Sequence, residues 1–547
     1  MTRREAVLSA AGIFLVALLA RVVVAAQIVF PKPEDTAYYV GVARNLLEGR
    51  GLVSDALWSF QTPPLVFPHP AFEVWLPLPS FLAAIPMALL GTTFAAAQWS
   101  AVLVGAIVPV LAWRLAADVA IERGLPSGRA RTLAIGTGLT SAVYLPLLLH
   151  SALPDSTMPF TVLALSACLL MARIAHDARG GRLRRGRLAD PRIIGLGVLI
   201  GLAGLTRNEA IYVGLAWLIV AWGIPALDRS ARLGLIGAVA VVAALVFVPW
   251  AIRDWAVFGS PLPGQALVNA FSVTGFDIFA WNDPPTLSRY LAVGPARLLE
   301  MRVEGLAHNL FNVLLLPGVP ISLIGFVGLP WAIRGAAIRP VVIVSFAAFL
   351  VTSLAFPVAT TWGTFLHASG PFQVLLVVSA LLALDAGFAR LGSRLGWTRP
   401  VAWLGALLGV FGSLLFSVAL LPTFGNGSAV TAERYRELAA VMADIGHPLD
   451  ASAGPVITNF PIWLAETQRI PALALPDEPP RDVLDLASTF KARLVVMLDA
   501  ESSHWPADID RGADGAACFR ELDLDAAPHR PTDGALRDVR AFEIVCP

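Results

Sequence analysis

The chain has 547 residues, of which 56% are hydrophobic and only 14% are charged, with a formal net charge of +1 and a mean hydropathy of +0.70. A soluble protein of this length would need far more charge on its surface, and the balanced charge gives no sign of a nucleic-acid partner. Apolar runs of about 20 residues recur as far as residue 422, each long enough to cross a hydrocarbon core of roughly 30 Å, so the sequence predicts a polytopic helical membrane protein.

Eleven membrane spans are predicted in chain order. The first follows a basic start and lacks a clean small-residue cleavage site, so we expect a retained helix and not a removed signal peptide. The predicted spans are 6–30, 94–117, 132–150, 156–175, 192–206, 210–226, 233–250, 308–333, 340–357, 367–388 and 400–422.

The run 71–90 is ambiguous, because it carries Glu73 and three prolines that interrupt a helix. The distribution of arginine decides it. If 71–90 does not span and the N-terminus is cytoplasmic, the inner segments hold twenty arginines, against about eight in the outer loops of the membrane domain. We therefore expect 71–90 to be a juxtamembrane or re-entrant element at the outer face of the plasma membrane.

This topology places several charged residues on one side. The outer face receives Glu34, Asp35, His69, Asp155, Arg207 and Glu209, together with the loop 251–307 and the tail after residue 422. A loop as long as 251–307 is often functional.

The tail 423–547 changes character. Charge rises, and helical patterns at 431–446, 461–468 and 479–491 alternate with strand-like runs at 455–459, 493–498 and 539–545. The predicted fold class is therefore an all-α polytopic membrane domain (1–422) with a small extracytoplasmic α/β domain (423–547). Cys518 and Cys546 would be able to pair in such a domain, whereas Cys168 lies within an apolar run.

The outer-face residues each have a structural and a functional interpretation. Glu34 and Asp35 either stabilise a helix N-terminus or supply a general base or metal ligand. Asp155 is either a helix cap or a second ligand or orienting acid. Arg207 and Glu209 either pair and anchor a helix junction or bind and position a phosphate. His150 is expected to be an interface residue.

The segment from Ala20-Arg21 through PEDTAYYVGVARNLLEGRGLV to PHPAFEVWLPLPSFLAAIPMALLG resembles the opening of GT-C-type membrane glycosyltransferases. The branches concerned are the protein mannosyltransferases, the aminoarabinose transferases and the RgtA/B/C/D-like family. The shared order is an arginine late in the first helix, an acidic pair, an aromatic helix with a glycine-rich end, and a proline-containing amphipathic segment. The resemblance is motif-like over about residues 20–91 and extends in layout over most of the membrane domain. The tail segment beginning TNFPIWLAETQ also resembles the extracytoplasmic domains of many bacterial members.

The resemblance implies sugar transfer at the outer leaflet. A hexose, pentose or aminosugar on a polyprenyl phosphate would pass, with inversion, to a hydroxyl of a lipid, glycan or protein. The family's first-loop aspartate falls on Asp35 by its spacing to Tyr39 and Ala43. Glu34 is an extra acid, since many relatives place their second acid at the position of Thr36, and its role stays open.

Catalysis of this kind needs a carboxylate base and positive charge at the phosphate. We predict Asp35, Glu34 and Asp155 as the catalytic acids, and a divalent metal ion held by Asp35 and Asp155 as the one cofactor. The predicted contacts to the donor phosphate are Arg207, Glu209, His69, Lys32, Arg253 and His367.

Two other classes compete with the glycosyltransferase. A transporter or lipid-linked sugar flippase predicts charges near the midplane of several helices and an internal two-fold repeat. Only Arg21 is plainly intramembrane and no repeat is visible, which disfavours transport. A catalytically inactive membrane scaffold would carry the same carboxylates and stays open.

Overall fold

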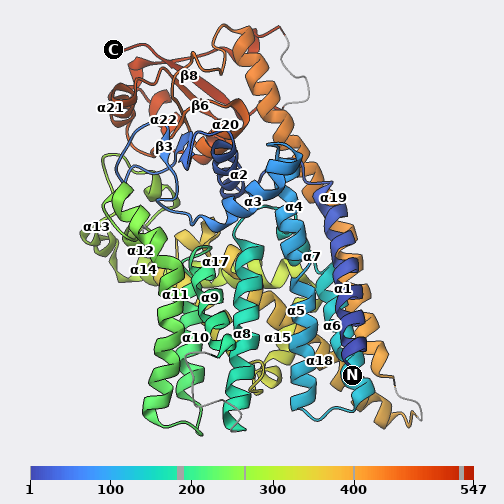
Figure 1. Cartoon of the computed structure of the whole chain (residues 1–547). Helices are drawn as coiled ribbons and strands as arrows, with labels where there is room; N and C mark the ends of the chain where they lie inside the picture. Colours follow the sequence, from blue (N-terminus) through green and yellow to red (C-terminus); the bar gives the residue numbers. More distant parts are fainter. Residues whose placement is uncertain (1, 181–189, 264–265, 398–400, 529–534, 547) are drawn as a thin grey trace.

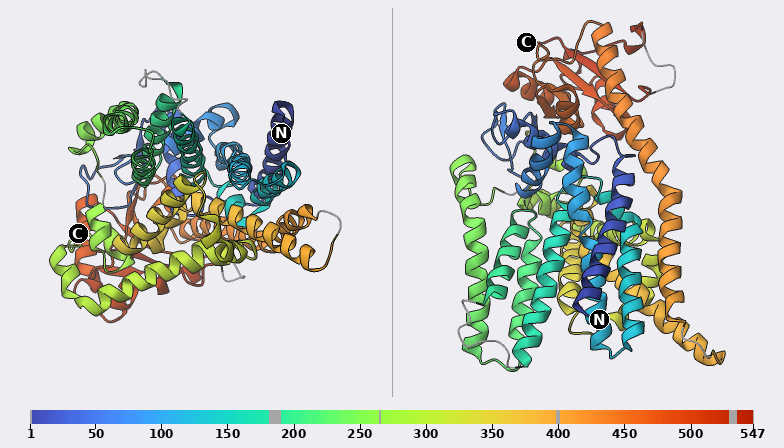
Figure 2. Two further views of the ribbon diagram at one scale, coloured as in Figure 1. Left: turned by 90° about the horizontal axis from the view of Figure 1, so that it is seen from below. Right: turned by 45° about the vertical axis from the view of Figure 1, so that its right-hand side comes forward.

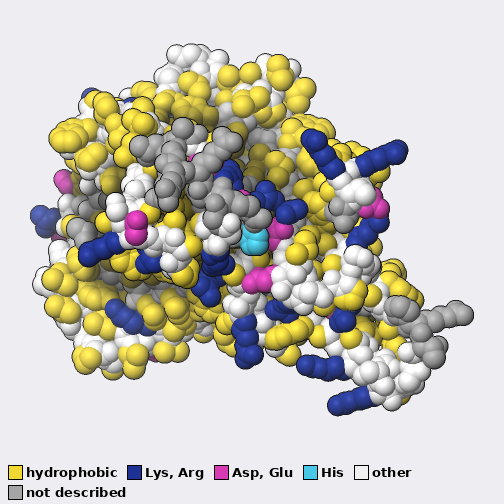
Figure 3. All heavy atoms as spheres, turned by 60° about the horizontal axis from the view of Figure 1, so that its bottom comes forward, with side chains coloured by type: hydrophobic (Ala, Val, Ile, Leu, Met, Phe, Trp, Pro, Cys, Tyr) yellow, Lys and Arg dark blue, Asp and Glu magenta, His cyan; other side chains and the backbone are white. Residues whose placement is uncertain are grey.

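A computed structural model describes residues 2–180, 190–263, 266–397, 401–528 and 535–546. A bundle of long helices carries a smaller sheet-containing part at one end, and the N-terminus lies toward the other end (Figure 1). Basic side chains are scattered over that other end (Figure 3). Five of the arginines counted as cytoplasmic, Arg182, Arg184, Arg185, Arg187 and Arg399, lie outside the described residues, as do residues 264–265 of the outer loop.

The predicted helical membrane domain is confirmed. Six helices of the described part are long and apolar enough to span a membrane, or seven if one bent pair is a single span, so the count of eleven stays a prediction. The helices of the bundle are α1 (Arg3–Ala25), α4 (Phe94–Gly105), α5 (Val108–Glu122), α6 (Ser127–Val143), α7 (Leu145–His150), α8 (Thr157–Arg179), α9 (Pro191–Gly204), α10 (Ala210–Trp222), α11 (Arg229–Phe258), α15 (Ile321–Ala332), α16 (Arg339–Ala355), α18 (Gly370–Arg394) and α19 (Ala402–Asp444).

Small residues bring the central helices together. A Cβ atom added at Gly325 would lie 2.5 Å from the carbonyl oxygen of Leu376, and one added at Gly328 would lie 2.7 Å from that of Ser379. Both glycines are on α15 and both carbonyls are on α18, so these two helices pack backbone against backbone. Van der Waals packing of this kind replaces the hydrophobic effect as the force between helices in lipid.

The predicted span 308–333 is wrong as a single helix. The helix α14 (Gly294–Ala307) continues as the π-helical η3 (His308–Leu315) and the short turn η4 (Leu316–Gly318), and this segment meets α15 at 116°. Pro317 and Pro320 lie at the bend, where proline cannot continue the hydrogen-bonding ladder.

Three short helices and α14 replace an extended loop after α11. They are α12 (Ala266–Phe271), η2 (Gly275–Phe279) and α13 (Leu287–Ala292), and they lie beside the top of α11 (Figure 1). The run 71–90 forms α3 (Leu78–Leu90), whose 13 residues cover only about 20 Å as a helix and are too short to cross a bilayer. It packs between α2 (Glu34–Leu47) and α4, as expected for a juxtamembrane element.

The predicted C-terminal α/β part is confirmed as a six-stranded sheet. Its strand order is β2-β5-β4-β6-β8-β7, parallel from β2 to β6 and antiparallel from β6 to β7. The strands are β2 (Ala56–Leu57), β4 (Val456–Thr458), β5 (Ala472–Ala474), β6 (Leu494–Met497), β7 (Phe519–Glu521) and β8 (Arg540–Ile544). The helices α20 (Pro461–Gln468), α21 (Pro480–Phe490) and α22 (Trp505–Asp510) connect them, and β1 (Val53–Ser54) pairs with β3 (His69–Pro70) nearby.

Two features join the sheet to the bundle. The edge strand β2 comes from the first outer loop and pairs with β5. The helix α19 runs unbroken from the bundle to the sheet, across the predicted boundary at 422/423 (Figure 2, right).

Cys518 and Cys546 form a disulfide across a sequence separation of 28 residues. We expect the double variant Cys518→Ser/Cys546→Ser to destabilise the sheet by about 3 kcal/mol, because the open chain regains loop entropy on unfolding. Hydrogen exchange of β7 and β8 in the full chain measures the effect. Cys168→Ser, in α8, is the control and should leave that exchange unchanged, and equally slow exchange in the double variant would contradict the prediction.

Candidate active site

Acids from two segments far apart in the sequence meet at one histidine. Nε2 of His367 lies 3.3 Å from Oδ2 of Asp35, and Nδ1 of the same ring lies 3.5 Å from Oδ2 of Asp155. Asp35 stands in the first turn of α2, Asp155 in the turn between α7 and α8, and His367 on α17 (Thr364–Ala368). The three residues are more than 100 positions apart, and all were predicted from the sequence.

The three side chains differ in exposure. Those of Asp155 and His367 are buried, whereas that of Asp35 keeps 23% of its surface exposed. Of the three, Asp35 is therefore the group that an incoming molecule can reach.

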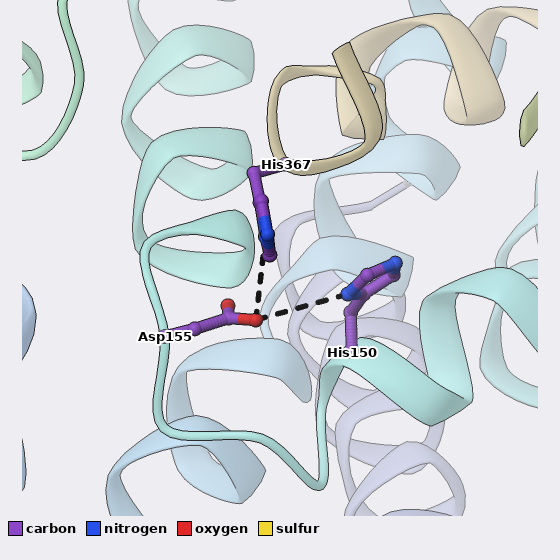
Figure 4. A group of neighbouring side chains, drawn as sticks. All are labelled: His150, Asp155 and His367. Atoms are coloured by element: carbon purple, nitrogen blue, oxygen red, sulfur yellow. Dashed lines mark ion pairs between the residues drawn. The ribbon is translucent and has the colours of Figure 1, made fainter. Parts of the chain in front are cut away.

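The two carboxylate oxygens of Asp155 have different partners. Its Oδ1 accepts a hydrogen bond from the backbone N–H of Thr157 at 2.8 Å, which supports the cap interpretation. Its Oδ2 faces His367 and His150, at 3.5 and 3.9 Å (Figure 4). Burial alone would raise the pKa of Asp155, but the two imidazoles outweigh it and hold the pKa below its ordinary value.

The pKa of His367 is also shifted by its neighbours. Burial alone would lower its pKa, but the carboxylates of Asp35 and Asp155 outweigh this effect and raise it. The Thr157 hydroxyl lies 2.8 Å from Nδ1 and fixes the orientation of the ring. The imidazole thus lies between two carboxylates, and each of its ring nitrogens faces one of them.

Arg207 and Glu209 lie at the same end of the bundle, in the turn between α9 and α10. The guanidinium meets the carboxylate with two hydrogen bonds of 3.0 and 2.8 Å, and both side chains are largely buried. The same guanidinium donates to Oγ of Ser156 at 2.8 Å and to the carbonyl oxygen of Thr364 at 3.1 Å. Arg207 therefore ties together the segments that carry Asp155 and His367.

Glu34 points toward the sheet and not toward His367. Its Oε1 accepts hydrogen bonds from the backbone N–H groups of Ile462 and Trp463, at 3.0 and 3.4 Å, at the start of α20. Burial raises the pKa of Glu34 to about 8, against these hydrogen bonds, which lower it. Glu34 therefore connects the first outer loop to the sheet-containing part.

The raised pKa of Glu34 predicts how stability changes with pH. Because the pKa is about 8 in the folded chain and the ordinary value is 4.5, the folded state holds the proton more tightly than the unfolded state. The stabilisation is complete below the ordinary value and is lost as pH rises through about 8. We expect the melting temperature to fall across this interval, and Glu34→Gln to flatten the slope. Glu48→Gln, at the exposed end of α2, is the control, and an unchanged slope in Glu34→Gln would refute the assignment.

Three of the predicted phosphate contacts are engaged elsewhere. His69 pairs with Glu73 at 3.3 Å in a fully buried position. Arg253 pairs with the neighbouring carboxylate at 2.9 Å and lies over an aromatic ring of α11. Lys32 is exposed and lies over an indole of α20. The structure does not bring these three residues into the group around His367.

His150 was expected to be an interface residue, but the structure adds it to the group around Asp155. Its position five residues before Asp155 was the one available signal. His150, Asp155 and His367 each offer one ligand atom, and these atoms all lie within 4.8 Å of one another.

These three residues fit a divalent metal ion. Nδ1 of His150 and Oδ2 of Asp155 are buried and have no hydrogen-bond partner within the described part of the chain. Separations of 3.5 and 3.9 Å are long for hydrogen bonds but are close to those between two ligands of one ion, with bonds of roughly 2.0–2.2 Å. Nitrogen and oxygen donors together suit zinc and its neighbours. The predicted metal pair was Asp35 and Asp155, but Asp35 is not in this group of three, because the His367 ring lies between the two carboxylates.

An apolar groove of about 510 Å³ lies between α9, α10 and α11. Its lining is almost wholly aliphatic and includes Gly204 and Ala210, which flank the Arg207–Glu209 turn. The groove therefore reaches the residues on either side of the Arg207–Glu209 turn.

No protein-family model and no curated protein matches the chain. Solved structures do. The oligosaccharyltransferase AglB from Archaeoglobus fulgidus, in complex with an inhibitory peptide and a dolichol-phosphate, aligns with a TM-score of 0.55 and 14% identity over 95% of this chain and 73% of that one. The same enzyme tethered to an acceptor peptide gives 0.56 and 15%, over 95% and 72%.

ArnT from Cupriavidus metallidurans, bound to undecaprenyl phosphate, aligns with a TM-score of 0.56 and 14% identity over 99% of this chain and 98% of that one. At such identities the likeness establishes the fold alone. The predicted GT-C-like fold, a membrane bundle with an attached α/β part, is thereby confirmed.

Proposed function

We propose that the chain is a membrane glycosyltransferase that moves a sugar from a polyprenyl-phosphate-linked donor to an acceptor hydroxyl on the outer face of the plasma membrane, with inversion. The N-terminus would lie in the cytoplasm and the sheet outside. One observation carries the proposal: Asp35 and Asp155 converge on His367 in a fold shared with structures that hold dolichol-phosphate and undecaprenyl phosphate.

The proposed step uses Asp35 as the base. Its carboxylate takes the proton of the acceptor hydroxyl, the acceptor oxygen forms a bond to the anomeric carbon, and the bond from that carbon to the phosphate oxygen breaks. Polyprenyl phosphate leaves with the bonding electrons. His367 holds the Asp35 carboxylate at 3.3 Å, and buried Asp155 fixes the imidazole from its other side. Asp155 and His367 are thus positioning residues.

Arg207 is the proposed cation for the donor phosphate, because it stands within hydrogen-bond distance of the two segments that carry Asp155 and His367. A fixed guanidinium stabilises phosphate charge without reorganisation during the reaction. The apolar groove between α9, α10 and α11 ends at its turn. A prenyl chain lying in that groove would place its phosphate beside Arg207.

A divalent metal held by His150, Asp155 and His367 would supply further positive charge beside the leaving phosphate. The imidazoles of His150 and His367 also keep the Asp155 carboxylate ionised, because they lower its pKa. This second property belongs to the chain itself.

Arg21, the intramembrane charge considered for a transporter, is a fixed structural group. Its guanidinium donates to Oγ of Ser151 at 3.0 Å and to the carbonyl oxygens of Ala17 and Ala142 at 3.1 and 3.3 Å. Ser151 directly follows α7 and precedes Asp155 by four residues, so Arg21 supports the turn that carries Asp155. This contact gives the transporter interpretation no support.

The test is an assay of the purified full chain in lipid nanodiscs. A panel of polyprenyl-phosphate-linked hexoses, pentoses and aminosugars is supplied, and released polyprenyl phosphate is measured with and without EDTA. We expect release from at least one donor, a lower rate in EDTA, and recovery with Zn²⁺ or Mn²⁺. Movement of intact donor across a bilayer without release would instead establish a transporter. The absence of both release and movement would establish a scaffold.

A further inference from the structure

A second cavity, of about 340 Å³, lies between the sheet and two outer segments of the bundle. It opens at the carboxyl ends of three adjacent parallel strands: Phe460 lies just beyond β4, Leu475 follows β5, and Asp499 lies just beyond β6. This edge of a parallel sheet is where ligands bind in α/β proteins. A cavity of this size takes a small molecule or the end of a chain, not a folded partner.

One wall of the cavity is aromatic. Phe276 and Phe279 of η2 face Trp362, with ring centroids 6.3 and 5.7 Å from the indole. Trp362 is the last residue of η5 (Ala359–Trp362) and keeps 48% of its surface exposed. Gly275 lies directly against the indole, where a Cβ atom would overlap it. The wall therefore holds Trp362 in place with much of its ring still available.

The sheet side of the cavity carries polar groups beside Phe460 and Leu475. The Asn459 side chain exchanges hydrogen bonds with the backbone of Leu498, which fixes the ends of β4 and β6 side by side. Asp499 has a left-handed backbone (φ +54°), and its carboxylate pairs with Arg434 while 52% of its side-chain surface stays exposed. The Ser503 hydroxyl lies on the same wall. Carboxylate and hydroxyl groups thus line the same small cavity as a set of aromatic rings.

Such a cavity matches the two-sided chemistry of a sugar ring. One face of a pyranose presents C–H groups that pack on an aromatic ring, while its hydroxyls bind carboxylates and other hydroxyls. A sugar ring therefore fits both the aromatic and the polar groups that line the cavity.

The cavity and the candidate active site share one segment of the chain. Trp362 is followed by Gly363 and then by α17, which carries His367 five residues on. A Cβ atom at Gly363 would lie only 3.4 Å from the His367 ring, so the segment turns tightly between the two positions. We infer that this cavity binds a sugar ring of a glycan acceptor and directs its hydroxyl toward Asp35, an assignment that rests on the proposed function.

The test measures sugar binding in the absence of any donor. The full chain is held in nanodiscs prepared without sugar-based detergent, and saturation-transfer NMR is recorded with methyl glucoside, methyl mannoside, methyl galactoside, maltotriose and mannotriose. We expect at least one probe to bind through one face of its ring. Trp362→Ala should weaken that binding roughly tenfold or more, since large aromatic anchors dominate such contacts.

Two further variants sharpen the result. Asp499→Asn should also weaken binding while keeping the fold, because asparagine tolerates the left-handed backbone. Trp331→Ala is the matched control: this tryptophan is similarly exposed, at 40%, but lies on α15 over Arg123. It should leave binding unchanged.

Binding of no probe, or equal binding to the wild type and to Trp362→Ala, overturns the assignment. Asp35→Asn protein should still bind the probes, which separates the two proposals. Sugar binding that depends on Trp362 in a chain that uses no donor would refute only the proposed function. Donor turnover in a chain that binds no sugar would refute only the cavity assignment.

Discussion

The variant Asp35→Asn is expected to release polyprenyl phosphate at least about a hundredfold more slowly than the wild type, because loss of a general base typically costs 10²–10⁴ in rate. Asparagine keeps the size of the side chain and its contact with His367, now 3.3 Å from a carboxylate oxygen, but accepts a proton poorly. The loss should appear in the maximal rate. Donor affinity should stay near that of the wild type, because Asp35 is not among the proposed phosphate contacts.

The matched control is Asp283→Asn. Asp283 is another acid of the outer loops, with 71% of its side chain exposed, and its replacement should leave the rate unchanged. Melting curves of both variants should superimpose on that of the wild type. Equal turnover by Asp35→Asn and the wild type would show that Asp35 is a loop acid without a catalytic role.

The second large effect concerns Arg207 and Glu209. The variant Arg207→Met leaves the Glu209 carboxylate, 7% exposed, buried without its partner, and we expect a loss of about 3–5 kcal/mol in the free energy of unfolding. The double variant Arg207→Met/Glu209→Leu removes both charges and should recover most of that stability. It should not recover donor turnover, because the proposed phosphate cation is still missing.

This pair of variants separates structure from function. Thermal unfolding in nanodiscs reports the first and polyprenyl phosphate release the second. The exposed pair formed by Arg297 and Glu300 on α14, with side chains 41% and 61% exposed, is the control, since removing one partner of such a pair costs little. A stable double variant with full activity would show that Arg207 is only a structural anchor.

Sequence reasoning placed five residues of the candidate site correctly on one face. The distribution of arginine predicted that five residues lie at one end of the bundle: Asp35, Asp155, Arg207, Glu209 and His367. The structure brings all five together. The count predicts shared ends because arginine gathers in the loops at one side of a membrane, and which side of the membrane that end faces stays a prediction.

Other parts had no usable signal. The strand β2 is two residues long, Ala56–Leu57, and its partner lies far away in the chain, so no local pattern announces it. The break within 308–333 was hidden by continuous apolarity, although Pro317 and Pro320 marked it. His150 looked like an ordinary residue at the end of an apolar run, because contact with Asp155 depends on how α7 ends.

The pairing of β2 with β5 affects the order in which parts of the protein can fold. Ala56 and Leu57 pair with Ala472 and Leu473, more than 400 residues later, and Glu34 accepts its hydrogen bonds from α20. Chains leave the ribosome N-terminus first, so β2 must wait, unpaired, until nearly the whole polypeptide has been made. A chain that ended before β5 would lack the partner of β2 and the helix α20 that donates to Glu34. The first loop therefore takes up its final structure only after the last part of the chain has been synthesised.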